Sequence, residues 1–125
     1  MESKMKSFTK SIACDVEREL AQAKDLAVKG HNSLAFQHLE NAHVLGQEST
    51  WWHVKVHILM LKWGIAQRDF KECLGQLLRI VGAATKTAIG LVPVGNTGGS
   101  NISPFKSMPL KPEHQAAIQK AKGQV

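Results

Sequence analysis

Residues 51–63 read WWHVKVHILMLKW, a run that is long and apolar enough to form a buried helix reaching about Ala66. Its length favours a helix over a strand, because buried strands commonly stop after about 4 to 8 residues. Glu48, Ser49 and Thr50 precede the run and supply an N-cap for it. The sequence on either side carries further helical patterns, so the predicted fold class is all-α.

Two helices are predicted before this run. Over residues 9 or 11 to 29, apolar residues recur at spacings of three and four, which is the signature of a helix. Gly30 interrupts the pattern, and a second helix follows. Asn32 or Ser33 is its predicted N-cap, and Gly46 ends it as a C-terminal glycine. These two helices form one hairpin.

A fourth helix follows the quoted run after a tight connection at Arg68, Asp69 and Phe70. Asp69 is its predicted N-cap, and apolar residues continue at helical spacing into residues 82–84. The third and fourth helices therefore form a second hairpin. With 125 residues, the chain has room for one domain and one hydrophobic core.

The two hairpins share a pattern that resembles the tetratricopeptide repeat, in which small residues let paired helices approach closely. The first hairpin matches the consensus spacing at Gly30, Ala35, Leu39 and Ala42. The equivalent places of the second hold Arg68, Cys73, Leu77 and Ile80. The prediction is therefore two tetratricopeptide-like helix hairpins, which supply the four main helices.

The chain changes character after the fourth helix. Residues 85–111 contain too much Gly and Pro for a continuous helix, yet they are too apolar for a free linker. We expect this segment, the C-terminal arm, to lie extended against the helices. A short helix from Pro112 to Lys122 ends the chain. The predicted organisation is a basic N-terminal tail at 1–10, a helical-hairpin core at 11–84, the arm at 85–111, and the C-terminal helix and tail at 112–125.

The net charge of +6 is concentrated at the two ends of the chain. Between Ser11 and Thr85, eight basic residues balance eight acidic ones, so the predicted core is neutral. Solubilising tails explain this distribution at least as well as a track for phosphate groups. The charge pattern therefore argues against nucleic acid as the partner.

Targeting features and cysteine spacing predict a cytoplasmic protein without a membrane helix. The N-terminus lacks the apolar segment of a signal peptide. The longest apolar stretch, from Leu77 to Val94, is interrupted by charged residues, Gly and Pro, and falls short of a membrane span of about 20 residues. Cys14 and Cys73 lack the spacing of a disulfide framework or a zinc knuckle.

Several strings of sequence are distinctive. They are AFQHLENAHVLGQ at residues 35–47, His53 and His57, the pair at 75–76, and PVGNTGG at residues 93–99. Through them the chain resembles a family of short bacterial proteins known as domain of unknown function thirty-seven-oh-three, over roughly residues 16–110. The resemblance implies a bacterial protein from a family without an established activity, and it transfers no catalytic or binding residue.

The histidines give the clearest lead to chemistry. His43 lies near the end of the second predicted helix, and His53 and His57 lie one turn apart near the start of the third, so the three can converge. The i, i+4 pair shares a helical face, as two ligands of one metal must, and Glu40 with His43 forms the Glu-x-x-His pattern of di-iron bundles. Such a site favours one transition-metal ion, Zn, Ni, Cu or Fe, with Glu40 or water completing the shell.

A structural role is the alternative for these histidines, and it is the commoner outcome of such spacing. Buried imidazoles would then hydrogen-bond across the hairpin while the tryptophans fill the core. Val54 stands where the zincin motif carries a glutamate, so metalloprotease chemistry has no support.

Two other candidate sites have weaker support in the sequence. One is the glycine-rich segment of the arm, made of Gly95, Asn96, Thr97, Gly98 and Gly99. Its backbone N–H groups could cradle an anion, but a tight structural turn that locks the arm is the favoured interpretation. Cys73 has no base beside it in the sequence and is interpreted as a packing residue.

Two functions follow from these observations. The leading one is a non-enzymatic protein-interaction module, in which stacked helix hairpins form a concave surface for a peptide or a partner protein. The arm could fill that groove in cis, or in trans to make a dimer. The alternative is a transition-metal-binding protein that uses the histidines. No catalytic residue is identified, so the sequence favours a protein that is not an enzyme.

Overall fold

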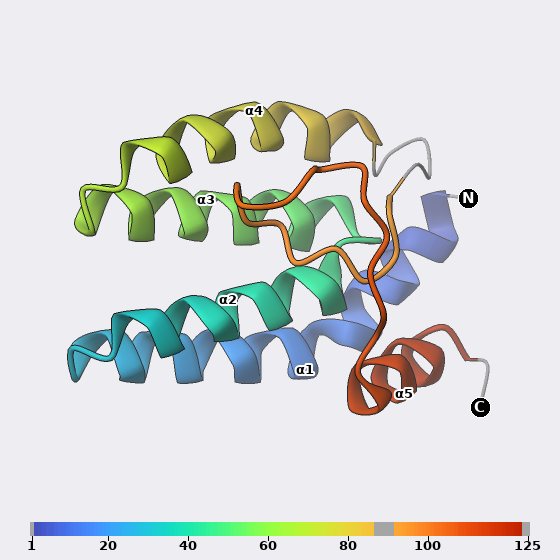
Figure 1. Ribbon diagram of the computed structural model, residues 1–125. Coiled ribbons are helices and arrows are strands. Elements are labelled where there is room, and N and C mark those ends of the chain that lie inside the picture. The colour runs from blue at the N-terminus through green and yellow to red at the C-terminus, as the bar shows by residue number, and fades with distance from the viewer. Residues whose placement is uncertain (1, 87–91, 124–125) are drawn as a thin grey trace.

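The computed structural model describes residues 2–86 and 92–123, and within them the chain forms five helices and no strand. They are α1 (Glu2–Val28), α2 (Asn32–Gly46), α3 (Thr50–Ala66), α4 (Phe70–Lys86) and α5 (Pro112–Ala121). Helix α1 packs on α2 and α3 packs on α4, and Figure 1 shows the arm crossing one face of these two pairs. The predicted all-α fold with two hairpins, an arm and a short last helix is confirmed.

Helix α1 is longer than predicted. Residues 2–10, expected as a basic tail, belong to this helix. Phe8 extends the i, i+4 row of Ile12 and Val16, and all three join the hydrophobic core. The tail prediction was wrong because the segment is rich in lysine and Phe8 is its one buried apolar residue, which is too little to show a helical pattern in the sequence.

The helix caps are partly as predicted. The side chain of Ser49 accepts a hydrogen bond from the backbone N–H of Trp52 at the start of α3 (3.4 Å), and Asp69 Oδ1 accepts one from Glu72 at the start of α4 (3.0 Å). These two caps confirm the prediction. Helix α2 instead begins directly after His31, which makes no side-chain cap hydrogen bond, so the predicted cap of α2 is wrong.

The two hairpin turns share one backbone feature. Gly30 has φ of +83° and Arg68 has φ of +56°, and these two positions correspond when the hairpins are aligned by sequence. The left-handed region is open to glycine and costs other residues roughly 1–2 kcal/mol. A relationship of these hairpins to tetratricopeptide repeats stays a prediction.

The hydrophobic core lies between α1, α2, α3 and α5. Its largest buried side chains are Phe8, Ile12, Val16, Leu39, Leu45, Trp52, Val56, Met60 and Ile118. Helix α4 contributes none of the cluster. Its inward side carries Glu72 and Gln76, both buried, while Leu74 and Leu77 are exposed. These leucines therefore lie outside the core, and a polar centre lies beneath this helix.

The described part of the arm lies against its own chain. The side-chain amide of Gln47 donates to the carbonyl of Pro93 (3.0 Å), and the guanidinium of Arg79 donates to that of Ile102 (2.6 Å). Residues 87–91, which belong to the predicted arm, lie outside the described residues. None of the helices in the described ranges has the length and apolar character that a membrane span requires.

Candidate metal centre

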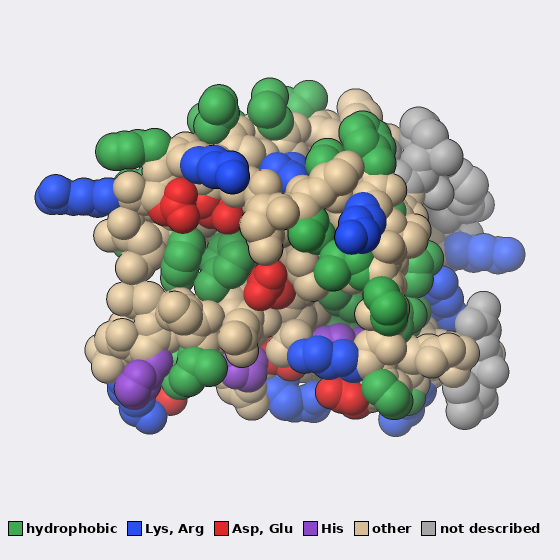
Figure 2. All heavy atoms as spheres, viewed as in Figure 1, with side chains coloured by type: hydrophobic (Ala, Val, Ile, Leu, Met, Phe, Trp, Pro, Cys, Tyr) green, Lys and Arg blue, Asp and Glu red, His purple; other side chains and the backbone are tan. Residues whose placement is uncertain are grey.

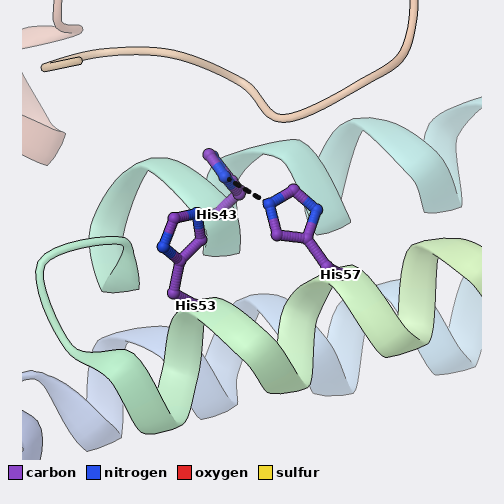
Figure 3. A group of neighbouring side chains, drawn as sticks. All are labelled: His43, His53 and His57. Carbon is purple, nitrogen blue, oxygen red and sulfur yellow. Dashed lines mark hydrogen bonds between the residues drawn. The ribbon is translucent and has the colours of Figure 1, made fainter. Parts of the chain in front are cut away.

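Three buried histidines meet where α2 leads into α3. His43 comes from the last turn of α2, and His53 and His57 come from the N-terminal half of α3. Each is at most 4% exposed. One ring nitrogen from each lies within 4.8 Å of the others, and Figure 3 shows the three rings gathered in the space between the two helices. The convergence predicted from the sequence is confirmed.

The arm fixes the orientation of His43. Its Nδ1 lies 2.6 Å from the backbone carbonyl oxygen of Asn96. A carbonyl oxygen can only accept a hydrogen bond, so Nδ1 carries the proton and donates it. In the neutral ring Nε2 is then unprotonated, and it points toward the other histidines.

Helix α4 fixes the orientation of His57 in the same way. Its Nδ1 lies 2.5 Å from Oε1 of Gln76. The amide nitrogen of Gln76 donates to a carboxylate oxygen of Glu72 (2.5 Å) and to the carbonyl of Gly98 (2.9 Å), which identifies Oε1 as the acceptor. The Nδ1 of His57 therefore donates, and its Nε2 is unprotonated when the ring is neutral.

The Nε2 atoms of His43 and His57 consequently face one another across 3.1 Å. A hydrogen bond over this distance, drawn as the dashed line in Figure 3, needs one of these rings to be an imidazolium, because each Nδ1 already donates. Burial opposes that charge, as do the charges of His57 and His53, and together they hold the pKa of His43 well below its ordinary value. In the absence of a cation, two lone pairs are left in contact.

A metal ion fits this arrangement. Zinc binds imidazole nitrogens at about 2.0–2.1 Å with tetrahedral geometry, which separates two ligand atoms by about 3.3 Å. The 3.1 Å between the two Nε2 atoms matches that separation, and side-chain rotation can close the remaining distances of up to 4.8 Å. An Nδ1–H that donates to a carbonyl or amide oxygen is also the usual outer-shell contact of a metal-binding histidine.

The space beside the rings is small. Besides the three histidines it is lined by Gln47, Arg79, Pro93, Asn96, Gly98 and Pro104. The cavity has a volume of about 10 Å³, which is close to the least that holds one water molecule. The guanidinium of Arg79 donates to the carbonyls of Gly75 and Ile102 and so fastens the arm over the cavity. The cavity has room for one water molecule but not for an organic substrate.

Sequence reasoning missed the polar support on α4. Besides the amide of Gln76, the carboxylate of Glu72 accepts the backbone N–H of Ser100 (3.1 Å) and its hydroxyl (3.0 Å), which ties the arm to the helix. A signal was present in the sequence, because Glu72 and Gln76 stand one turn apart on the helix face opposite Leu74. Their connection to the histidines depends on which side of α4 packs on α3, and their connection to the arm depends on its path; no local pattern predicts either.

Glu40 does not belong to the histidine group. It lines a separate pocket with His38, Thr97, Lys111 and His114. Burial raises the pKa of the Glu40 carboxyl, and a hydrogen bond with Thr97 opposes that rise. The expected ligand pair of Glu40 and His43 is therefore not formed, since the Glu40 carboxyl hydrogen-bonds to Thr97 while Nε2 of His43 faces His57.

The glycine-rich segment at 95–99 forms a turn beside the histidines. Gly95 and Gly98 have φ of +79° and +85°, and the backbone N–H of Gly98 donates to Oδ1 of Asn96 (2.9 Å). The side-chain nitrogen of Asn96 donates to the carbonyls of Ser103 and Lys106 (2.8 and 2.7 Å). Asn96 thus organises the turn through its side chain while its own carbonyl holds His43.

Comparison with known proteins places the chain in a family. No curated protein and no solved structure matches it. A family model matches residues 10–118, which include every helix at least in part and the whole histidine centre. The chain belongs to the family described as "Protein of unknown function (DUF3703)".

Proposed function

We propose that this protein binds a transition-metal ion, with His43, His53 and His57 as its ligands. The observation that carries the proposal is the pair of Nε2 atoms of His43 and His57, which face one another at 3.1 Å while both Nδ1 atoms donate elsewhere. A set of imidazole ligands suits Zn, Cu, Ni or Fe. Water in the remaining cavity would complete the shell.

The closure of the site supports metal binding itself as the function, rather than turnover of a substrate. The arm covers the histidines, and the cavity of about 10 Å³ admits no organic molecule. Such a centre suits the retention or transfer of an ion, or a fold that depends on the ion. Elemental analysis of protein purified without a histidine tag tests the proposal.

We expect near-stoichiometric metal, and a lower Tm after a chelator removes it, because a ligand of the folded state stabilises that state. Replacing His53 and His57 by Gln should abolish metal loading and leave the helical circular dichroism intact. His31→Gln is the matched control, since His31 is exposed and lies outside the site. The proposal would be refuted if the wild-type protein took up none of Zn, Cu, Ni and Fe and its Tm did not change when the chelator was added.

We also propose the protein-interaction role expected from the sequence as a second function. Its support is the outward face of α4, where large apolar side chains are exposed. The partner would bind there rather than in a concave groove, because the arm lies across the helix pairs.

A further inference from the structure

The outward face of α4 is apolar over most of the helix. We call its five side chains the α4 stripe; they are Phe70, Leu74, Leu77, Leu78 and Val81, exposed by 52–77%. Figure 2 shows hydrophobic side chains gathered along the edge of the molecule where Figure 1 places α4.

Helix α4 is inverted relative to an ordinary surface helix, which buries its apolar face and exposes its polar one. Its buried side holds Glu72 and Gln76, because these residues support His57 and the arm. Among the described helices, α4 packs on α3 alone. The polar centre therefore occupies the inner face of α4. Within the described residues, the side chains of the stripe remain exposed to solvent.

The spacing of the stripe suits a helical partner. Phe70, Leu74, Leu77 and Val81 follow one another at intervals of four, three and four residues, which is the a and d spacing of a coiled-coil seam. Leu78 widens the seam on one side. Packing against a second helix with the same seam would bury all five side chains.

The area and the charges of the stripe favour a second copy of this chain as that partner. Five side chains of this size, each more than half exposed, present roughly 600 Å² per copy, which approaches the roughly 800 Å² per partner of a standard interface. Helices that lie on membranes instead carry many Lys and Arg residues on their polar face. Here that face is buried, Arg79 donates to backbone carbonyls, and Lys71 is an exposed charge beside the stripe.

We propose that the protein forms a homodimer in which the α4 stripes of two copies pack against one another about a two-fold axis. A two-fold interface uses the same patch on both copies, so one apolar helix face is enough to close the assembly. This inference sharpens the interaction role proposed above and is independent of the metal.

Sedimentation velocity of the full chain tests the dimer, in reducing buffer because Cys14 is exposed. We expect a dimer at micromolar concentrations, and a monomer with unchanged circular dichroism for Leu77→Glu, which places like charges across the interface. The milder double variant Leu74→Ala and Leu78→Ala should raise the dimer Kd at least tenfold. Val28→Glu is the matched control, because Val28 is an exposed apolar residue of α1, and it should stay dimeric.

Three outcomes would overturn the inference. They are a wild-type protein that is monomeric throughout, a dimer that survives Leu77→Glu, and a monomer that binds vesicles of anionic lipid through the stripe. Metal content of the same samples reports on the histidine centre separately, so loss of the dimer and loss of the metal are distinguishable.

Discussion

Gly98 lies directly over the ring of His43, so closely that a β-carbon added to Gly98 would be 2.5 Å from Cδ2 and 2.9 Å from Nε2 of that ring. This approach lets the backbone of the arm cover the histidines. It requires glycine at this position for a second reason besides the φ of +85°. The arm is therefore shaped to the histidine centre.

Replacing Gly98 by Ala should displace the arm from His43. Gly30→Ala is the matched control, because Gly30 has nearly the same φ (+83°) but has nothing within 4 Å of an added β-carbon. Strain alone should lower the free energy of unfolding by about 1 kcal/mol in the control. Gly98→Ala should add a clash of about 1–3 kcal/mol and weaken metal binding. Urea denaturation and metal titration check this, and equal losses in the two variants would contradict it.

Gln76 connects His57 to both Glu72 and Gly98, so Gln76→Met should damage the centre while keeping the side-chain size. The Nδ1–H of His57 loses its acceptor and the carbonyl of Gly98 loses its donor, while the carboxylate of Glu72 keeps the two donors of Ser100. Each unsatisfied group costs about 1–3 kcal/mol, and loss of an outer-shell contact typically lowers metal affinity about 10- to 100-fold.

Competition titration with a chelating dye measures the affinity of the Gln76 variant for zinc. Gln115→Met, on the exposed side of α5, is the control and should match the wild type. Unchanged zinc affinity in Gln76→Met would show that Gln76 does not orient a metal ligand.

Sequence patterns predicted α3 well, because the apolar run at residues 51–63 is longer than a buried strand. They failed for residues 2–10, where Phe8 alone marks the buried face and lysines surround it. They gave no prediction of the orientation of α4, because the apolar period distinguishes two faces of a helix and does not say which one is buried. The polar contacts of Glu72 and Gln76 decide that orientation.

The histidine convergence was predictable because a short connection joins the end of α2 to the start of α3. The outer shell was not predictable in this way. Asn96 and Gly98 reach His43 only because the arm folds back over the helices, 53 residues beyond His43 in the case of Asn96. Gln76 reaches His57 because α4 packs on α3 with its polar side inward. Glu40 was misplaced because sequence spacing does not show that its side chain turns toward Thr97.

The hydroxyls of Thr9 and Ser49, 2.6 Å apart, hold the first part of α1 against the start of α3. Ser49→Ala removes both this contact and the cap of α3, so the free energy of unfolding should fall by about 1–2 kcal/mol. Thr9→Val removes this contact and the hydrogen bond from the Thr9 hydroxyl to the carbonyl of Met5 (2.8 Å), but it leaves the cap of α3 in place and should cost less. In a double-mutant cycle measured by urea denaturation, the two losses should not add; full additivity would show that the hydroxyls do not interact.

Acid should destabilise the protein partly through His114 of α5, which is 7% exposed. Burial lowers the pKa of this imidazole; the positive charge of Lys111 lowers it further, while Glu113 and Glu19 oppose the shift. Below the unfolded pKa of about 6.5, His114 takes up a proton in the unfolded chain but stays neutral in the folded protein until the pH is lower. The free energy of unfolding therefore falls as the pH drops below that value.

Urea denaturation of the metal-free protein at about pH 7.5 and about pH 5.5 measures this loss. The wild type should lose more free energy of unfolding between the two pH values than His114→Gln, because glutamine does not titrate. His31→Gln removes an exposed histidine instead and should keep the wild-type loss. If His114→Gln lost as much stability as the wild type between the two pH values, the acid sensitivity would come from other groups. The buried His43, whose pKa is also lowered, would then be the next residue to replace.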